Sequence, residues 1–545
     1  MPPHESPFQL LDWLVLVFYF GGTLAIGVFF YRRTRSIEGY TAGNRSLPGW
    51  VCGLSILATY VSSISYLALP GKSFATNWNA FAFSLSIPFV AIIAVKYFLP
   101  YYRKSGAVSA YELLEDRFGP WARIFTSSFY LLFHIARIAV VLYLMALPMQ
   151  VIFGWNIYTI LIVTGICVTL YSLIGGLSAV IWTDAMQALV LIGGALICLV
   201  VLLMGAPGGP SGMIETANAH DKFSLGSFSL TDFTNTTFWV IFLFGIVDNL
   251  RNFGIDQSYI QRYIASKTDA EARRSVWMGS LLYIPVSALF FFIGTTLFSY
   301  YGAQQTLTSE PLTIEAPGDL NAVYDVVTQQ KLSQQDLPPD SPEATEIKNS
   351  LTLTDVGDRV FPHFISDKLP QGLRGLLVAA IFAAAMSTVS TSLNSSATLI
   401  MNDFYKRFLN PKASEASSMK ALYLGTILWG LLGTTLGLYL VQVTDSALSI
   451  WWTLSGIIGG GMTGLFLLGL INKAAGNRAA IVATIAGIIT ICWISWPKIT
   501  SLFGGQSEPI LHAQMAPVIG VIATLLVGAL FTFFVKKQSS SNAPA

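Results

Sequence analysis

Two apolar segments of the chain carry an unusual density of side-chain hydroxyls. The first spans residues 56–66 and is followed by the helix breakers Pro70 and Gly71. A helix that unwinds within an apolar segment exposes backbone carbonyl oxygens, which are hard ligands suited to sodium. Alternatively, the hydroxyls bond back to carbonyls of their own helix or reach a neighbouring helix. The hydroxyl-bearing residues of this segment are Thr59, Tyr60, Ser62, Ser63, Ser65 and Tyr66.

The second segment, residues 383–396, predicts a helix with hydroxyls gathered on one face. Residues at the spacing i, i+3, i+4, i+7 share a helical face. Small residues on such a face also permit close helix packing, which is the alternative interpretation, but close packing does not require so many hydroxyls. The residues at this spacing are Ala384, Ser387, Thr388 and Thr391, with Ser390 beside them.

Four charged residues lie within apolar segments, where an arginine costs about 2.5–3.5 kcal/mol to insert. Asp248 and Arg251 stand at i, i+3 and can neutralise each other. Arg137 has no acidic neighbour in the sequence, and the remaining charge is Asp184. A fixed guanidinium beside a cavity can grip a carboxylate through two hydrogen bonds. Arg137 therefore predicts a site for a carboxylate-bearing solute.

The elements that position these residues follow from the composition. The chain has 545 residues, of which 53% are hydrophobic and 11% charged. Many apolar runs reach the roughly 20 residues that a membrane-spanning helix needs, and backbone pairing in lipid favours helices. We predict an all-α, polytopic membrane bundle of about thirteen spans, and neither a basic surface for nucleic acid nor an enzyme centre. The spans lie near 10–31, 50–70, 78–101, 124–153, 157–177, 181–206, 236–261, 277–301, 372–405, 418–442, 447–472, 478–497 and 514–535.

Basic residues predict the orientation of these spans. Arginines and lysines gather in alternate connections, starting with the one after the first span. By the positive-inside rule these connections are cytoplasmic, which places the N-terminus outside and the C-terminus inside. The N-terminal residues do not predict a cleaved signal peptide, so the first span belongs to the mature protein.

The ten central spans divide into five plus five, and a unit with an odd number of spans inserts the second time with opposite topology. The division expected is a leading helix and cytoplasmic loop (1–49), a first repeat (50–206), an external loop (207–235), a second repeat (236–472), two accessory helices (473–536) and a disordered tail (537–545). Within the second repeat, residues 302–371 are expected to form a long, acidic external loop, either a solvated connector or a cap.

Three separated motifs resemble the sodium/solute symporter family: residues 174–184, the turn Leu393-Asn394-Ser395, and residues 257–262. The resemblance extends over nearly the whole chain. Within the family it is nearest to the bacterial sodium–sialic acid symporters, on residues 58–65, 133–144 and 381–395. It implies a leucine-transporter-like fold, alternating access, co-transported Na⁺ and residence in the inner (plasma) membrane.

The resemblance also implies site residues. The common sodium site would use backbone oxygens of Ala58, Val61 and Ala384 with the hydroxyls of Ser387 and Thr388. A second sodium would bind at Asp184, Ser387, Ser390 and Thr391. Arg137 matches the arginine that holds the substrate carboxylate. The other positions implied at the substrate are Tyr60, Ser62, Ser65, Ser84, Asn249, Arg251 and Asn252.

Some of these residues depart from the pattern of the sialic acid transporters. Tyr60 stands in place of a small threonine, Ser84 in place of a glutamine, and Arg251 and Asn252 in place of two glutamines. The expectation is therefore a sodium-coupled importer of a small anionic solute, such as a carboxylated sugar, acting in the lipid bilayer without an obligate protein partner. The alternatives are a sodium symporter for a neutral sugar or polyol and, from another class, a channel or sensor.

Overall fold

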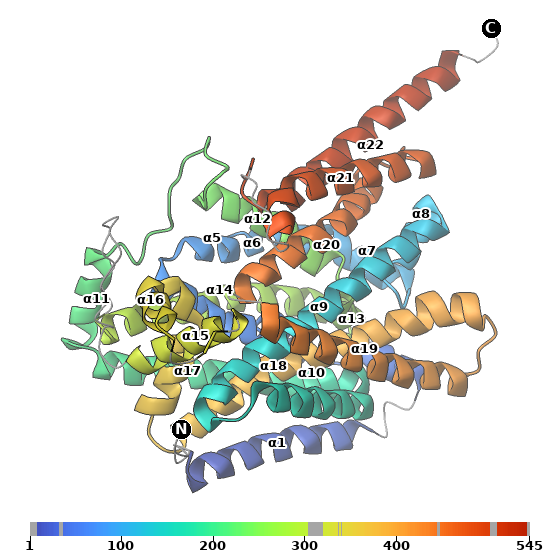
Figure 1. Cartoon of the computed structure of the whole chain (residues 1–545). Coiled ribbons are helices and arrows are strands. Elements are labelled where there is room, and N and C mark those ends of the chain that lie inside the picture. Colours follow the sequence, from blue (N-terminus) through green and yellow to red (C-terminus); the bar gives the residue numbers. More distant parts are fainter. Residues whose placement is uncertain are drawn as a thin grey trace.

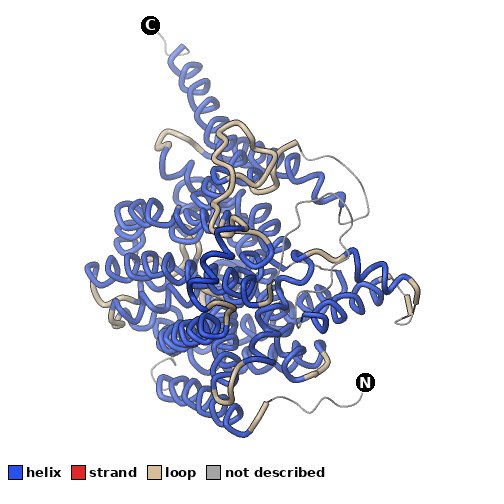
Figure 2. The backbone as a smooth tube through the Cα atoms, turned by 90° about the vertical axis from the view of Figure 1, so that its left-hand side faces the viewer, coloured by secondary structure: helices blue, strands red, loops and turns tan. Residues whose placement is uncertain are grey.

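The computed structural model describes residues 8–31, 36–302, 320–335, 337–338, 341–443, 447–501 and 510–541. Helices account for most of this described part, and its β-structure is a single bridge between Leu47 and Ser266. Figure 1 shows α1 along one side of the bundle, while α21 and α22 project from another; Figure 2 shows the same helical character from a second side. The prediction of an all-α protein is confirmed.

The helices follow the predicted order. The first half contains α1 (Leu10–Tyr31), α2 (Ile37–Ala42), η1 (Gly43–Arg45), α3 (Gly49–Tyr60), η2 (Ile64–Ala68), α4 (Leu69–Ala75), η3 (Asn79–Phe81), α5 (Ala82–Leu85), α6 (Ile87–Ile93), η4 (Ala94–Phe98), α7 (Leu99–Ser105), α8 (Glu112–Phe118), α9 (Pro120–Phe153), α10 (Ile157–Gly205) and α11 (Gly209–Ala219). The second half contains α12 (Phe238–Gly254), α13 (Gln257–Ala265), α14 (Asp269–Tyr300), α15 (Asn321–Gln334), α16 (Glu343–Ser350), α17 (Leu353–Lys368), α18 (Leu373–Leu399), η6 (Ile400–Leu409), α19 (Glu415–Val443), α20 (Ala447–Ile471), α21 (Asn477–Ser501) and α22 (Met515–Ser541).

Two apolar helix pairs are sharply bent. The path from α3 into η2 and α4 turns by 60°, and the path from α12 into α13 turns by 47°. The first bend occurs at Val61, whose backbone is extended (φ −81°, ψ 102°). The helix break predicted for residues 56–66 is therefore present, although it precedes Pro70 and Gly71 rather than coinciding with them.

The long helix α10 contains both spans predicted at 157–177 and 181–206. Gly176 interrupts it with φ 53° and ψ −175°, a conformation that favours glycine because it has no Cβ. The two predicted spans are the two arms of this kinked helix.

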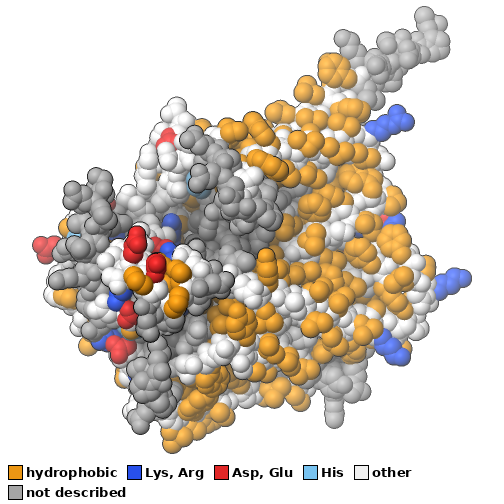
Figure 3. Space-filling model, in the orientation of Figure 1, with side chains coloured by type: hydrophobic (Ala, Val, Ile, Leu, Met, Phe, Trp, Pro, Cys, Tyr) orange, Lys and Arg blue, Asp and Glu red, His pale blue; other side chains and the backbone are white. Residues whose placement is uncertain are grey.

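Among the described residues, nine helices are long and apolar enough to cross a membrane, or eleven if each bent pair forms one span. Two shorter apolar helices, Ile157–Leu170 and Ile458–Ile471, accompany them. Figure 3 shows hydrophobic side chains over most of one face, while acidic side chains gather at the end that carries α15 and α16. A surface of this kind suits a protein that is embedded in the hydrocarbon core of a lipid bilayer.

The segment 302–371, expected to be a loop, instead contains the three helices α15, α16 and α17. Helix α17 packs against α4 and α9, and it buries Val356, Val360, Phe361 and Phe364. These residues recur at the spacing of one helical face, but interspersed charges lower the hydropathy of the segment and hide the pattern. The expectation of a solvated connector is wrong for α17; residues 303–319, 336 and 339–340 lie outside the described part.

The N-terminus of α18, the helix that carries the predicted sodium ligands, is held by a carboxylate from α1. Asp12 is fully buried and accepts hydrogen bonds from the amides of Gly372 (2.7 Å) and Gly375 (2.8 Å). A negative charge at this position satisfies free amide groups and complements the helix dipole. At the other end of the chain, α22 continues to Ser541, into the segment 537–545 for which the sequence predicts disorder; residues 542–545 are outside the described part.

Candidate functional site

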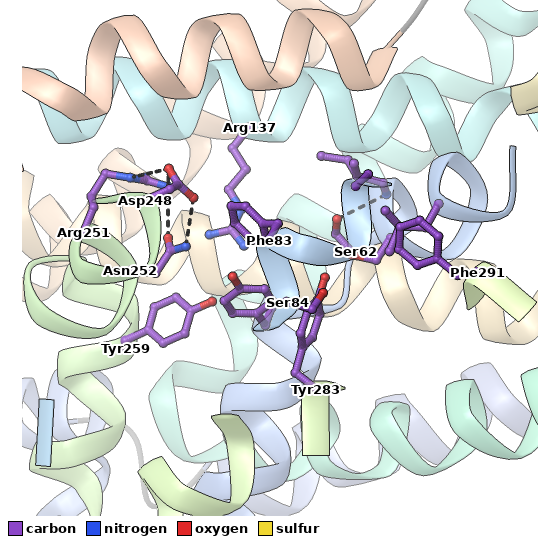
Figure 4. A pocket seen from close by; sticks show the side chains of 15 residues that line it. Ser62, Phe83, Ser84, Arg137, Asp248, Arg251, Asn252, Tyr259, Tyr283 and Phe291 are labelled. Carbon is purple, nitrogen blue, oxygen red and sulfur yellow. Dashed lines mark hydrogen bonds and ion pairs between the residues drawn. The ribbon is translucent and has the colours of Figure 1, made fainter. Parts of the chain in front are cut away.

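A cavity lies beside the break between α3 and η2 and receives side chains from α9, α12 and α14. Arg137 reaches into it between a polar cluster on α12 and the ring of Phe83 (Figure 4). Most of the residues predicted at the substrate meet here, although their positions in the sequence are far apart. The lining residues are Tyr60, Ser62, Ile64, Ser65, Leu69, Ala80, Phe83, Ser84, Arg137, Asp248, Arg251, Asn252, Tyr259, Tyr283 and Phe291.

Arg137 projects from α9 toward the break in the first bent pair. It is 6% exposed, and its Nη2 donates a hydrogen bond of 2.6 Å to the carbonyl oxygen of Thr59. The Thr59 carbonyl lies at the C-terminal end of α3, where the helix no longer supplies a backbone amide as donor. The Arg137 side chain supplies the donor instead. The arginine therefore links the cavity to the backbone of the helix break.

The second arginine of the cavity, Arg251, is neutralised by its own helix. Its Nη2 donates to Asp248 at 2.9 Å and to Asn252 at 3.0 Å, and its guanidinium lies 4.0 Å from the ring centre of Phe133. Ser455 of α20 also donates to Asp248, at 2.8 Å. The i, i+3 neutralisation considered from the sequence is thus present. Nη1 of Arg251 is buried and has no hydrogen-bond partner among the described residues, so one donor remains for a ligand.

Aromatic rings form another wall of the cavity. The ring centre of Tyr60 lies 4.2 Å from that of Tyr283 and 6.3 Å from that of Tyr259. The hydroxyl of Tyr60 donates to Asn249, whose amide donates in turn to Ser86 at 2.9 Å. Asn249 therefore lies behind Tyr60 and does not line the cavity, unlike the other residues predicted at the substrate.

Sequence reasoning did not single out several lining residues. Tyr259, Tyr283, Phe83 and Phe291 belong to buried helices in which an aromatic residue most often fills the core. Their sequence carries no signal that separates a cavity wall from ordinary packing. Ser84, which sequence reasoning did include, pairs with Ser287 of α14 at 2.8 Å.

Oxygen atoms from α3 and α18 meet near the cavity. The hydroxyl of Ser387 donates to the carbonyl of Ala58 at 3.0 Å and to that of Ala384 at 3.2 Å. The hydroxyl of Thr388 donates to the same Ala384 carbonyl at 3.2 Å. Four of the five oxygens predicted for the common sodium site are thus in mutual contact across two helices, with Val61 at the adjoining break. Carbonyl and hydroxyl oxygens are the ligand types that hard cations prefer.

A buried ion pair occupies the region predicted for a second sodium. Asp184 of α10 accepts from Arg262 of α13 at 2.8 Å and from Ser55 at 2.7 Å, and Thr391 lies 3.4 Å away. The other carboxylate oxygen, Oδ1, has no partner among the described residues. Asp184 and Thr391, both predicted as ligands of a second sodium, are thus in contact, whereas the part played by Arg262 was not predicted.

Ser390 directly precedes Thr391 on α18. Its hydroxyl donates to the carbonyl of Ser387 at 3.3 Å, within α18. Arg262 also donates to Thr391 at 2.7 Å, so the guanidinium and the Thr391 hydroxyl share Oδ2 of Asp184. Oδ2 of Asp184 is thus engaged by the Arg262 guanidinium, while Oδ1 has no hydrogen-bond partner among the described residues.

The fold and the site together define a polytopic helical transporter with a central, broken-helix binding cavity. The chain matches the model of the sodium:solute symporter family over residues 40–330 and 340–487, and it belongs to that family. It is similar to the sodium/sialic acid symporter NanT of Aliivibrio fischeri (29% identity, covering 98% of this chain and 95% of NanT) and to the sodium/sialic acid symporter SiaT of Proteus mirabilis (30% identity, covering 96% of each).

A solved structure agrees with this assignment. The structure of a Na⁺-coupled sialic acid symporter in a substrate-bound, outward-open state superimposes with a TM-score of 0.79 at 28% identity, covering 97% of this chain and 98% of that one. The protein is therefore a multi-pass membrane symporter that couples the movement of a small organic solute to Na⁺, and members of its family are transporters rather than enzymes.

Proposed function

We propose that this protein imports sialic acid, or a closely similar carboxylated sugar, through the cavity around Arg137. The observation that carries the proposal is a buried arginine that reaches a cavity next to a helix break and donates to the broken helix at Thr59. NanT and SiaT, which are sodium/sialic acid symporters, are similar over nearly the full chain. In this proposal the substrate carboxylate is held by Arg137, with Ser62 and Ser65 beside it.

The rest of the solute would lie against the polar and aromatic walls. Ser84, Asn252 and Nη1 of Arg251, which has no hydrogen-bond partner among the described residues, supply hydrogen bonds to hydroxyl groups. Tyr60 fills space or stacks on a ring, since aromatic faces pack well against the apolar side of a sugar. Asn249 is assigned an indirect part, because it holds the hydroxyl of Tyr60. The solute is an anion in this proposal, and the protein works in the bilayer without an obligate protein partner.

Two sodium ions accompany each solute in this proposal. The first binds at Ala58, Val61, Ala384, Ser387 and Thr388, and the second at Asp184, Ser387, Ser390 and Thr391. One sodium carried with a monoanion is electrically neutral, so the membrane voltage would not contribute. A second sodium restores one net positive charge, which is worth about 2.3 kcal/mol per 100 mV.

The number of membrane spans, their division into repeats and the orientation of the termini are also part of this proposal. Counting each bent pair and each short apolar helix as a span gives the thirteen predicted from the sequence, with ten of them in two inverted repeats, 50–206 and 236–472. The leading helix (1–49), the connection 207–235, the accessory helices (473–536) and the tail complete the chain. The basic connections place the N-terminus outside and the C-terminus in the cytoplasm of a cell whose inner membrane holds the protein.

Uptake of labelled sialic acid into proteoliposomes tests the proposal directly. With sodium outside and a negative interior, we expect accumulation that depends on sodium and generates an inward current. Sodium-dependent uptake of a neutral sugar or polyol, without uptake of sialic acid, would instead favour the alternative substrate class. A lack of any sodium effect on uptake or ligand binding would contradict the two sodium sites.

Ser387→Ala should weaken sodium binding at both proposed sites. The variant removes a hydroxyl that contacts Ala58 and Ala384 and leaves the backbone carbonyls in place. A hydrogen-bonding group of this kind is worth about 1–1.5 kcal/mol, so the half-saturating sodium concentration should rise roughly tenfold. The measurement is initial uptake as a function of sodium concentration. Ser392→Ala is the control, because Ser392 donates to Thr388 within α18 and is not a proposed ligand; an equal rise in both variants would contradict the assignment.

A further inference from the structure

Three polar side chains follow one face of α9 and reach different parts of the bundle. Tyr130, His134 and Arg137 stand at i, i+4 and i+7, so they lie one above the other along the helix. All three are buried, with at most 6% of each exposed. Tyr130 donates to Ser395 of α18 at 2.8 Å, and Arg137 donates to the carbonyl of Thr59. This face of α9 therefore contacts both α18 and the helix break that follows α3.

His134 reaches the other helix break, which lies between α12 and α13. Its ring is fully buried, and Nε2 lies 3.3 Å from Oδ2 of Asp256. Because an ionised carboxylate only accepts hydrogen bonds, Nε2 carries the hydrogen and donates it. Nδ1 has no hydrogen-bond partner among the described residues, so Asp256 is the polar partner of this ring within them. The ring stacks on Tyr130 with ring centres 4.0 Å apart, which keeps Nε2 directed at Asp256.

Asp256 stands at the point where the chain turns by 47° between α12 and α13. The amides of Ile255 and Asp256 both donate to the carbonyl of Arg251 at 2.9 Å, which ends α12. Oδ1 of Asp256 accepts from the amide of Ser258 at 2.9 Å and so caps the N-terminus of α13. One oxygen of this carboxylate therefore begins α13, while the other accepts from α9 through His134.

We propose that His134 and Asp256 are positioning residues for transport, which attach the second helix break to α9 as Arg137 attaches the first. Alternating access moves one group of helices against another around a binding site that stays in place. Two attachments one turn apart on α9 hold both breaks beside the cavity, while the helical arms beyond each break are left to change their angle. These roles depend on sodium-coupled transport, which follows from membership of the family, and not on the identity of the solute.

The attachment also determines where the end of α12 lies relative to the cavity. Asp248 and Arg251, which form an ion pair of 2.9 Å, line the cavity from the last turns of α12. Figure 4 shows both residues beside Arg137. His134 and Asp256 are not among the lining residues, so their contact acts on the cavity through the end of α12. Loss of this contact should loosen the break and leave the groups that touch the solute and sodium in place.

Amide hydrogen exchange of the full-length protein in nanodiscs tests the attachment without any solute. His134→Phe keeps an aromatic ring against Tyr130 and removes the donor, so the amides of residues 255–260 should exchange about tenfold faster. His134→Gln retains an N–H donor and should restore slow exchange. Ser127→Ala is the matched control, because it removes another buried donor of α9, which reaches Asp403 and lies about 10 Å from His134 along the helix axis.

Uptake of labelled sialic acid into proteoliposomes tests the part that the pair plays in transport. With kcat expressed per solute-binding site, His134→Phe should lower kcat about tenfold and leave the KM and the half-saturating sodium concentration within about twofold of the wild type. His134→Gln should recover most of the rate. Simple destabilisation would instead reduce the number of binding sites and leave kcat per site unchanged.

Faster exchange at the break and a lower kcat in His134→Phe, both reversed in His134→Gln, support the proposed attachment. Unchanged exchange at residues 255–260, or an equal acceleration in Ser127→Ala, overturns it, and so does an unchanged kcat, with or without a raised KM. Where His134→Phe does not fold, Asp256→Ser takes its place, because serine also caps a helix but lacks the second oxygen for His134. An absence of sialic acid uptake by the wild type overturns the proposed substrate alone, and the exchange measurement then decides the attachment.

Discussion

Replacing Arg137 by glutamine is expected to lower the efficiency of uptake of an anionic solute by roughly 30- to 4,000-fold. Removing one partner of a buried, hydrogen-bonded charge pair costs about 2–5 kcal/mol, and each 1.4 kcal/mol corresponds to a factor of ten. Arg137→Lys keeps the charge and loses the planar, two-donor geometry, so its uptake should fall between those of the wild type and the glutamine variant. The measurement is kcat/KM for labelled sialic acid in proteoliposomes.

Because Arg137 also contacts Thr59, a measurement of sodium binding is needed beside the measurement of uptake. Because Arg137 donates to the broken helix, its loss could disturb the bend as well as the substrate. Stabilisation of the purified variant by sodium, measured as a shift in melting temperature, should persist if the loss is confined to the substrate. Arg117→Gln is the matched control, since Arg117 also donates to backbone carbonyls, those of Gly469 and Asn472, outside the cavity. Unimpaired uptake of the acid by Arg137→Gln would contradict the proposed carboxylate site.

The sequence predicted the membrane helices well because hydropathy depends on local composition. The run of apolar residues in α1 or α19 is sufficient to identify it, and Gly176 marks the division of α10. Helix α17 was missed for the opposite reason: its partners, α4 and α9, are distant in sequence, and its charged residues hide an apolar face. A local sequence pattern therefore identifies a helix only when recognising that helix does not require knowledge of the helices that pack against it.

The candidate site likewise contains features that local sequence patterns predict and features that depend on contacts between distant residues. Hydroxyl clusters on α3 and α18 could be recognised from the sequence, whereas the pairing of Ser387 with the Ala58 carbonyl was expected only from the family resemblance. The donor that holds the end of α3 could not be recognised, because Arg137 approaches Thr59 from another helix. The pair of Asp184 and Arg262 joins residues 78 positions apart, and sequence gave no reason to connect them.

Asp184→Asn is expected to change the coupling of transport from two sodium ions per solute to one. A tenfold sodium gradient is worth about 1.4 kcal/mol per ion, and 100 mV is worth about 2.3 kcal/mol for each net charge moved. Two sodiums with a monoanion therefore support roughly 10³- to 10⁴-fold accumulation, whereas one sodium supports about tenfold. The variant should keep its exchange of solute but accumulate it only about tenfold and lose the inward current, as measured by flux ratios of labelled sodium and solute under voltage clamp.

The ion pair with Arg262 separates a coupling defect from simple destabilisation. Breaking a buried pair leaves an uncompensated charge and costs about 3–5 kcal/mol, so Asp184→Asn should also melt at a lower temperature. Asp403→Asn is the matched control, because Asp403 is equally buried and pairs with Arg123 at 2.6 Å away from the sodium ligands. Thr391→Ala removes a neutral ligand without unpairing Arg262 from Asp184. Two sodiums per solute in both Asp184→Asn and Thr391→Ala would contradict the second site, whereas a changed ratio in these variants, with an unchanged ratio in Asp403→Asn, would locate the second ion at Asp184.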